Sequence, residues 1–162
     1  MSTAGAVVCR VAVEPGDLEA CFAVRKEVFV VEQRVPENLE YDEYDAAAVH
    51  VLAVGDDGLP LGTGRLLTGD AAAAKNGGDA GVGALGRLAV TRAARGLGVG
   101  AALVGAIEDA ARARGLAAVD LHAQTHALGF YERLGYEVYG PEFPDAGIPH
   151  RAMRKALGNA PA

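Results

Sequence analysis

A glycine-rich turn connects a short apolar run, typical of a strand, to an alanine- and leucine-rich segment typical of a helix. Its glycines are Gly96, Gly98 and Gly100. A glycine-rich turn between a strand and a helix leaves backbone N–H groups free at the helix start, where the dipole favours negative charge. Glycine has no Cβ atom, so an anion can approach closely and the turn can adopt positive φ. Arg95 and Arg92 add positive charge. The stretch therefore predicts a phosphate or pyrophosphate site, and a tight turn that binds nothing is the alternative.

The spacing of these glycines excludes two common phosphate loops. No Gly-Lys-Ser/Thr follows them, as a P-loop requires, and Gly96-Leu97-Gly98-Val99-Gly100 lacks the G-x-G-x-x-G spacing of a dinucleotide fingerprint. The pattern Arg95-x-x-Gly98-x-Gly100 after a strand instead resembles the acetyl-CoA pyrophosphate loop of the GNAT acetyltransferases. A nucleotide-binding α/β domain is correspondingly disfavoured.

Four further strings resemble the ElaA-type branch of that superfamily and occur in the same order, over about residues 20–155. Any one string alone is weak, but four in register with the loop make the resemblance specific. The strings are Phe29-Val30-Val31-Glu32-Gln33, Ala123-Gln124, Phe130-Tyr131-Glu132-Arg133-Leu134-Gly135-Tyr136 and Gly147-Ile148-Pro149-His150.

The resemblance implies an α/β fold in which a central, mixed and mostly antiparallel sheet is flanked by helices. It implies a single N-acetyltransferase domain over residues 1–162, with a core of about 7–156 and a frayed tail at 157–162. It also implies direct transfer of an acetyl group from acetyl-CoA to a primary amine in a ternary complex, without a metal. A CoA-binding regulatory or interaction module of the same fold, without turnover, is the alternative.

The resemblance assigns acetyl-CoA to two adjoining segments. Strand backbone in the first segment would pair with the pantetheine arm, and one N–H there would polarise the thioester carbonyl like an oxyanion hole. This requires that the strand diverge from the strand that follows it. The pantetheine residues are Leu88, Ala89 and Val90, and the pyrophosphate residues are Arg95, Gly96, Leu97, Gly98, Val99 and Gly100.

Tyr131 is the candidate acid that protonates the departing CoA thiolate, and it belongs to the same acetyl-CoA site. It occupies the tyrosine position of the family's Phe-Tyr helix. A phenol with a pKa near about 10 suits a thiolate of similar basicity. The alternative is an aromatic side chain packed against Phe130 and Leu134 with its hydroxyl satisfied.

The acceptor amine must lose a proton, and a carboxylate or a histidine can take it directly or through water. Glu32 is one candidate, because it follows the first helix, where the superfamily places a wall of the acceptor site. His150 is another, because Pro149 fixes its own φ and restricts the residue before it, which presents His150 rigidly. Asp42, Asp45 and a water chain stay open. For a lone histidine, a structural role is the simpler interpretation.

Composition limits the class of partner. Of the 162 residues, 51% are hydrophobic and 22% charged, as in a globular protein. A net charge of −6 disfavours nucleic acid and anionic membranes, and it favours a cationic small amine over a peptide acceptor. Cys9 and Cys21 are expected to be free thiols, and neither a signal-peptide pattern nor a long apolar span occurs. We therefore expect a cytoplasmic protein, and the resemblance to the superfamily implies a monomer or a homodimer.

Apolar periodicity and turn residues predict the elements that position these groups. Strands are expected at about residues 7–13, 49–54, 61–68, 84–90, 119–122, 136–139 and 150–155. Helices are expected at about residues 17–30, 98–114 and 127–134, the first with Asp17 as its N-cap. Residues 69–83 are expected to form a flexible loop.

Three local features carry expectations of their own. The acidic loop over residues 37–45 is either solvated or the rim of a pocket for a cation, to which its tyrosines would add a cation–π face. Arg25 lies on an apolar helix face and is expected to pair with Glu32 or with a carboxylate of the acidic loop. Gly105, inside a helix, is expected where close packing needs a small residue.

Overall fold

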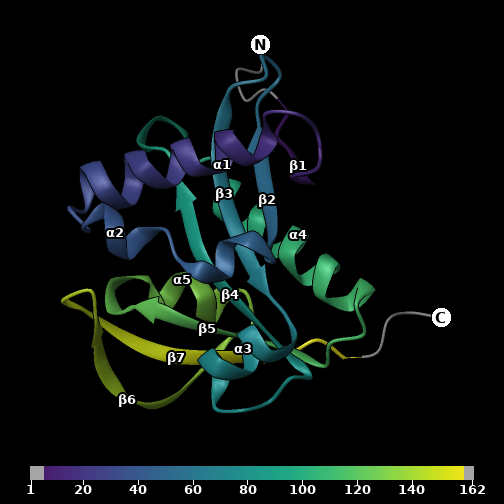
Figure 1. Cartoon of the computed structure of the whole chain (residues 1–162), viewed down its shortest axis with the longest axis vertical. Coiled ribbons are helices and arrows are strands. Elements are labelled where there is room, and N and C mark those ends of the chain that lie inside the picture. Colours follow the sequence, from purple (N-terminus) through teal and green to yellow (C-terminus); the bar gives the residue numbers. More distant parts are fainter. Residues whose placement is uncertain (1–5, 159–162) are drawn as a thin grey trace. The chain divides into compact units, whose positions relative to one another are not determined.

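A computed structural model describes residues 6–158, which fall into two compact units (Figure 1). The first unit consists of the described residues up to 65 together with 87–107, and the second of 66–86 together with the described residues from 108 onward. Three elements pass through both units, namely β3 (Pro60–Leu67), β4 (Val82–Val90) and α4 (Val99–Ala113).

The strand order is β1-β2-β3-β4 in the first unit and β4-β5-β7-β6 in the second. β4 is parallel to β5 (Ala118–Gln124), while β1 (Val8–Val11) is antiparallel to β2 (Val49–Val54). β7 (Ile148–Ala156) pairs antiparallel with β5 and with β6 (Glu137–Asp145). This mixed, mostly antiparallel sheet of seven strands, with helices between them in the sequence, confirms the predicted fold class.

Helix α1 (Asp17–Arg25) packs on β2 in the first unit. It continues as a π-helical segment, Lys26–Glu32, after which the N–H of Gln33 bonds to the Val28 carbonyl five residues back at 3.0 Å. The apolar spacing of residues 17–30 fits an ordinary helix, so nothing in it announced the wider turn.

Gly16, with a φ of 85°, is the N-cap of α1, and the prediction that Asp17 caps the helix was wrong. The Asp17 carboxylate instead accepts hydrogen bonds from Arg10 at 2.9 Å and from the Glu14 N–H at 3.2 Å. These bonds join the start of α1 to β1.

The segment predicted as an acidic loop forms α2 (Glu37–Glu40) and a 3₁₀ turn (Glu43–Ala46). A capping box starts the turn: the Asp42 carboxylate accepts from the backbone of the turn, and the Asp42 N–H donates to the Asp45 carboxylate at 3.1 Å. The segment is therefore held by its own side chains, and Glu40 is buried.

Helix α3 (Gly69–Asn76) occupies most of the segment that was expected to be a flexible loop, and that expectation was wrong. Four consecutive alanines favour a helix, and Gly77 ends it with a φ of 89°. The Asn76 amide donates to the carbonyls of Asp79 and Val82 at 2.8 and 2.9 Å, which joins the helix end to β4.

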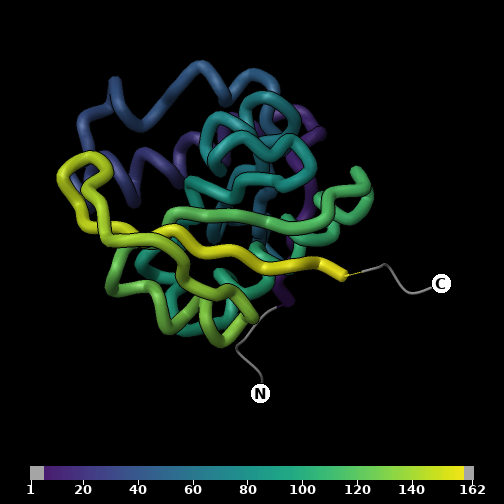
Figure 2. Tube along the Cα trace, turned by 90° about the horizontal axis from the view of Figure 1, so that it is seen from below, coloured from purple at the N-terminus to yellow at the C-terminus, as the bar shows by residue number. Residues whose placement is uncertain are grey.

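The strands β6 and β7 of the second unit form a hairpin, whose turn lies at the left in Figures 1 and 2. Helix α5 (Leu128–Arg133) contacts β5 and β6. The buried Tyr136 donates to Glu108 at 2.9 Å, and Lys155 donates to the same carboxylate at 3.1 Å, so α4 and β7 meet at one carboxylate.

Three smaller predictions concern the two cysteines, Gly105 and the C-terminal residues. Both cysteines are free thiols, as predicted. At Gly105 no heavy atom of the described chain lies within 4 Å of a Cβ position, so the expectation of close packing there was wrong. Leu157 is buried and its N–H donates to the Ala117 carbonyl at 2.9 Å, so the predicted frayed tail was wrong for that residue, while 159–162 lie outside the described residues.

Candidate active site

The glycine loop between β4 and α4 turns left-handed at two glycines. Gly96 and Gly98 have φ values of 81° and 80°, and α4 begins directly afterwards. The N–H of Ala102 donates to the Gly98 carbonyl at 3.1 Å. The N–H groups of residues 99–101 come before this bond, in the first turn, where a helix offers its own N–H groups no acceptor. The loop thus presents adjacent donors at the positive end of a helix dipole.

The surroundings of the loop leave room for an anion. Within the described residues, no heavy atom lies within 4 Å of a Cβ position at Gly96 or Gly98, and Leu97 between them is 59% exposed. A phosphate group can therefore reach the backbone donors without displacing a side chain. These residues fit the pyrophosphate of a CoA ester, which the sequence had assigned to them.

Arg95 and Glu32, predicted for two different roles, form a bidentate ion pair. Both N–O distances are 2.6 Å, and Arg92 lies 3.6 Å from the same carboxylate. The Nε of Arg95 also donates to the Val90 carbonyl at 3.1 Å. The hydrogen bond from Arg95 lowers the pKa of the Glu32 carboxyl, which makes Glu32 a weaker proton acceptor than a free glutamate.

A left-handed residue, Arg87, lies inside β4. The pairing of β4 with β5 ends at Leu85↔Leu121, and two residues later Arg87 has a φ of 54°. Residues 88–90, expected to pair with pantetheine, follow directly in the first unit. Nothing in the sequence indicated this backbone conformation, because glycine or asparagine, not arginine, is the usual sign of positive φ.

Three arginines and three carboxylates form a largely buried network in the first unit, here named the ionic cluster. Its members are Arg25, Arg65, Arg87, Glu40, Asp42 and Asp45. Arg25, with 1% of its side chain exposed, donates to Glu40 and to Asp45, each at 2.7 Å. Arg65 donates to Asp42 at 2.7 Å and to Asp45 at 2.9 Å.

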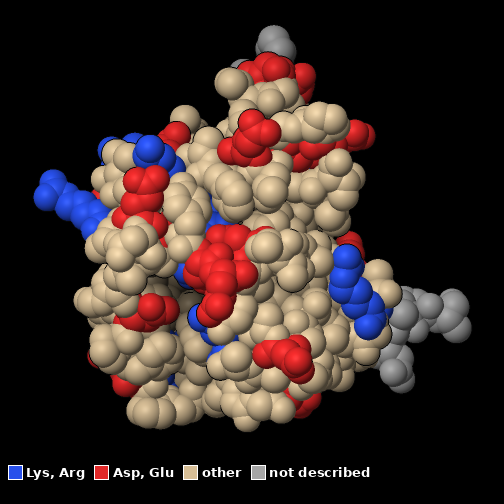
Figure 3. Space-filling view, in the orientation of Figure 1, with Lys and Arg blue, Asp and Glu red and all other residues tan. Residues whose placement is uncertain are grey.

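The ionic cluster decides how the acidic segment 37–45 is to be interpreted. Arg25 pairs with carboxylates of this segment, which was one of the two predicted alternatives, whereas Glu32 pairs with Arg95. Three carboxylates of the segment are bound by Arg25 and Arg65, so the interpretation of the segment as a solvated loop was wrong. The face drawn in Figure 3 shows acidic side chains over the segment that follows α2, with basic side chains beside them. The cation next to the Tyr41 ring is Arg25, 5.2 Å from its centroid.

The sequence analysis left Asp42 and Asp45 as candidate general bases, but the arginines around them make both carboxylates weaker proton acceptors. Burial opposes the ionisation of Asp45, but hydrogen bonds from Arg25 and Arg65 outweigh it and lower the pKa of Asp45 to about 2. Burial likewise opposes ionisation of Asp42, yet the hydrogen bond from Arg65 leaves its pKa below the usual range. A carboxylate held in this way accepts a proton poorly near neutral pH.

Tyr131 lies on α5 in the second unit, with 8% of its surface exposed. Its ring makes edge-on contacts with Phe130 and Tyr136 at centroid distances of 4.9 and 5.9 Å. The packing expected under a structural role is therefore present. Burial also raises the pKa of Tyr131, so the phenol keeps its proton throughout the physiological range, as a general acid requires.

His150 lies on β7 and is fixed by the carbonyl of Ile148, 2.6 Å from its Nδ1. A carbonyl can only accept, so Nδ1 carries the proton and the neutral ring has its lone pair on Nε2. The ring stacks on Phe143, whose other contact is an edge-on one with His122 at 5.0 Å. Burial lowers the pKa of His122, and the second unit therefore offers two imidazoles on either side of one phenylalanine.

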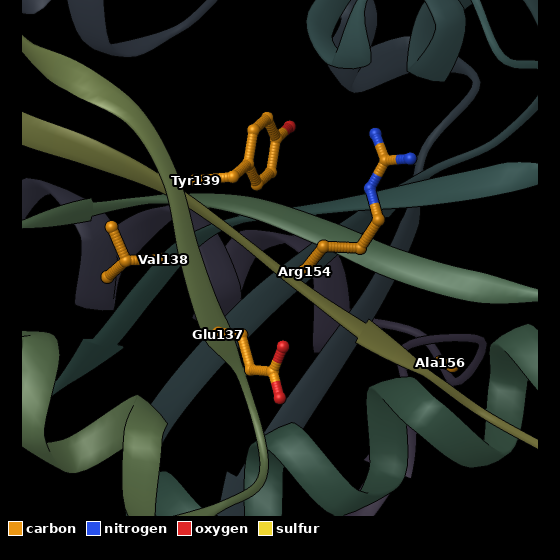
Figure 4. A pocket seen from close by; sticks show the side chains of 5 residues that line it. All are labelled: Glu137, Val138, Tyr139, Arg154 and Ala156. Carbon is orange, nitrogen blue, oxygen red and sulfur yellow. The ribbon is translucent and has the colours of Figure 1, made fainter.

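A pocket of about 420 Å³ lies on the β6–β7 hairpin, where Tyr139 and Arg154 extend to the same side (Figure 4). Both donate to the Asp120 carboxylate, the arginine at 3.0 Å, and Asp120 is 1% exposed. None of the predicted site residues lines this pocket. The sequence analysis overlooked this group, although an aspartate between Val119 and Leu121 in a strand was a visible signal.

Two kinds of feature are absent from residues 6–158. No group of three or more His, Cys, Asp or Glu side chains in that range is arranged to hold a metal ion. In the same part of the chain, no helix combines the length and the apolar character that crossing a membrane would require.

Comparison with known proteins gives these features a family context. Residues 12–157 match the family described as acetyltransferase (GNAT) domain. YjcF of Bacillus subtilis (strain 168), described as an N-acetyltransferase, is 41% identical over 139 residues, which cover 85% of this chain and 91% of YjcF. A protein of Lactobacillus plantarum described as an N-acetyltransferase has a TM-score of 0.82 at 29% identity, covering 94% of this chain and 99% of that one. ElaA of Escherichia coli has a TM-score of 0.78 at 25% identity, covering 93% and 99%.

Proposed function

The chain belongs to the GNAT acetyltransferase family, and we propose that it transfers the acetyl group of acetyl-CoA directly to a primary amine while both substrates are bound. The observation that carries the proposal is the glycine loop at the start of α4. It combines two left-handed glycines, open space around them and backbone donors at a helix N-terminus. Such an arrangement suits a pyrophosphate, which every CoA ester contains, and this supports the proposal.

Acetyl-CoA would supply the acetyl group as a thioester. The amine nitrogen bonds to the carbonyl carbon, the C–S bond breaks, the sulfur takes up one proton and the amine nitrogen gives one up. The chain's residues have two tasks: to hold both substrates close together, and to accept and return these protons. A backbone N–H of Leu88, Ala89 or Val90 is proposed to polarise the carbonyl.

Tyr131 is proposed as the acid that protonates sulfur. Support comes from its phenol, which is protonated at neutral pH like any tyrosine. Burial raises the pKa of Tyr131, which makes it a weaker acid than a free phenol, so the shift itself does not add to the support. A replacement by phenylalanine preserves the ring contacts with Phe130 and Tyr136 and removes only the proton donor.

His150 is proposed as the base in preference to Glu32. The hydrogen bond from the Nδ1 of His150 to the Ile148 carbonyl leaves the Nε2 lone pair available, whereas both oxygens of Glu32 are bonded to Arg95. Glu32 keeps a place in the proposed acetyl-CoA site as the partner of Arg95.

The proposed acceptor is a small cationic amine. The net charge of −6 favours the approach of a small cation, such as a polyamine or an amino sugar. Membership of the ElaA-like branch is part of the proposal, and the order of the shared sequence strings together with the likeness to ElaA supports it.

The experiment that tests the proposal has two steps. Calorimetry first measures whether the full chain binds acetyl-CoA; absence of binding would refute the proposal outright. Incubation with acetyl-CoA and a panel of amines and peptides, read by mass spectrometry, then asks for an acetylated product. Binding without any product would instead favour a CoA-binding module that does not turn over.

Two substitutions assign the protons once a product is known. Tyr131→Phe is expected to lower kcat and to leave the Kd for acetyl-CoA nearly unchanged. His150→Gln is expected to lower kcat/KM, because it removes the Nε2 lone pair that would accept the amine proton. His126→Gln is the matched control, because His126 is not among the proposed site residues and its Nε2 lies 2.6 Å from the Gln124 Oε1.

A further inference from the structure

Arg87 holds an unfavourable backbone conformation in the middle of a strand. Its φ of 54° lies in the left-handed region, which residues with a Cβ atom rarely adopt outside turns. Such a conformation persists only where the surroundings hold it in place. The contacts of the Arg87 side chain show what holds it.

The guanidinium of Arg87 is bonded to the end of α2. Its Nε donates to the Glu40 carbonyl at 3.0 Å, and its Nη2 donates to the Leu39 carbonyl at 3.3 Å. The carboxylates of Glu40 and Asp42 each lie 3.3 Å from the same guanidinium. Two of these acceptors are backbone atoms, so the contact fixes Arg87 relative to the chain of α2 and not merely to a mobile side chain.

The partners of Arg87 are themselves held from other elements. The Glu40 carboxylate accepts from Arg25 on α1 at 2.7 Å, and Asp42 accepts from Arg65 on β3 at 2.7 Å. The side chains of Arg25, Arg65 and Glu40 are each at most 4% exposed. Arg87 is therefore tied to a rigid part of the first unit.

The backbone after Arg87 is held by β3 within the first unit. The N–H of Thr91 bonds to the Leu61 carbonyl at 2.9 Å. At Gly62 the β3 backbone comes so close that a Cβ would lie 2.8 Å from the Ala89 carbonyl. The pairing with β5 has already ended at Leu85↔Leu121. Residues 88–90 are therefore oriented by β3 and by Arg87, which precedes them.

We propose that Arg87 is a positioning residue for the acyl-pantetheine arm. Its bonds to α2 hold the left-handed backbone conformation at position 87, and this conformation orients the backbone of residues 88–90. The proposal rests on the proposed acetyl-CoA site. It separates the two parts of that site, because Arg87 would act on the pantetheine segment and not on the pyrophosphate loop.

Calorimetry with two ligands tests this separation. One ligand is acetyl-CoA, and the other is 3′-phosphorylated ADP, the part of CoA that has the pyrophosphate but no pantetheine. Arg87→Gly permits positive φ but removes the bonds to α2. It is expected to weaken acetyl-CoA by about tenfold or more, as misplacement of a positioned group commonly does, and to leave the second ligand within about twofold.

Arg34→Gly is the matched control. Arg34 is also an arginine with positive φ, 61°, but its side chain is exposed. This variant relieves the same backbone strain without touching the ionic cluster, and it is expected to bind both ligands as the natural chain does. Arg87→Lys is the second variant, in case Arg87→Gly fails to fold; it keeps the charge, loses the forked donors, and is expected to lose acetyl-CoA affinity selectively as well.

Hydrogen exchange supplies a readout that does not depend on a ligand. The amides of residues 88–90 are expected to exchange faster in Arg87→Lys and in Arg87→Gly than in Arg34→Gly. Equal weakening of both ligands, or unchanged binding and exchange in a folded variant, would overturn the assignment of Arg87. If the natural chain binds neither ligand, the proposed function fails, and the role of Arg87 fails with it.

Discussion

Alanine at Gly98 and alanine at Gly105 should have opposite effects, although both positions belong to α4 or its cap. Gly98 has a φ of 80°, while Gly105 lies inside the helix, and neither has a heavy atom of the described residues within 4 Å of a Cβ position. Steric overlap with neighbours is therefore excluded at both sites. Only the backbone conformation distinguishes them.

The magnitude for Gly98→Ala follows from that conformation. A residue with a Cβ costs about 1–2 kcal/mol in the left-handed region. If the loop keeps its shape, the chain loses this much stability, which lowers Tm by about 2–8 °C at this chain length. If the loop relaxes instead, binding must restore its shape, and the Kd for acetyl-CoA rises by about 5- to 30-fold.

Gly105→Ala provides the matched control. Alanine is preferred over glycine inside a helix by about 0.5–1 kcal/mol, so Tm should rise by about 1–4 °C with no change in Kd. Differential scanning fluorimetry and calorimetry measure both quantities on the two variants. If Gly98→Ala changes neither Tm nor Kd, the left-handed turn is not what prepares the loop for an anion, and the argument from loop geometry is refuted.

Three further predictions concern charged groups. Glu32→Gln should tighten acetyl-CoA binding in calorimetry, because Arg95 no longer has a competing carboxylate; weaker binding would mean that Glu32 itself contacts the ligand. Arg25→Met should lower the free energy of unfolding in urea by about 1–3 kcal/mol, since it removes one of the two arginine partners of each of the buried carboxylates Glu40 and Asp45, and an unchanged free energy of unfolding would show a solvated cluster. Asp45 has a folded pKa of about 2 against an ordinary 3.8, so its contribution to stability is complete above pH 4 and is lost as the pH falls towards 2. The fall in stability between pH 5 and 2 should be smaller in Asp45→Asn, and an identical fall would assign the effect to other carboxylates.

The parts of the site that depend on local spacing could be predicted from the sequence. The glycine loop is one, because glycines at alternate positions between a strand and a helix determine both the conformation and the free donors. The fold class is another, because strand and helix patterns follow one another over short distances. Helix α3 was missed because its alanines show no amphipathic period. Only their helix propensity indicated a helix there.

The ionic cluster could not be predicted in the same way. Arg25 reaches carboxylates 15 and 20 residues away, and Arg87 reaches a carbonyl 47 residues away. Sequence reasoning identified the charged residues and one possible pairing, but the partner of each arginine depends on tertiary packing. The pair of Arg95 with Glu32, 63 residues apart, was missed for the same reason, and each residue had been given a separate role.

The π-helical segment Lys26–Glu32 places a constraint on the number of residues between α1 and Glu32. Arg25 and Glu32 are seven residues apart, a spacing that an α-helix closes to almost two full turns and so to one face. Because Lys26–Glu32 is wound more widely, the same seven residues fall short of two turns, and the two side chains turn to different partners, the ionic cluster and Arg95. Deleting one residue from this stretch would let it rewind as an α-helix and carry Glu32 away from Arg95. Related chains should therefore conserve the number of residues in this segment.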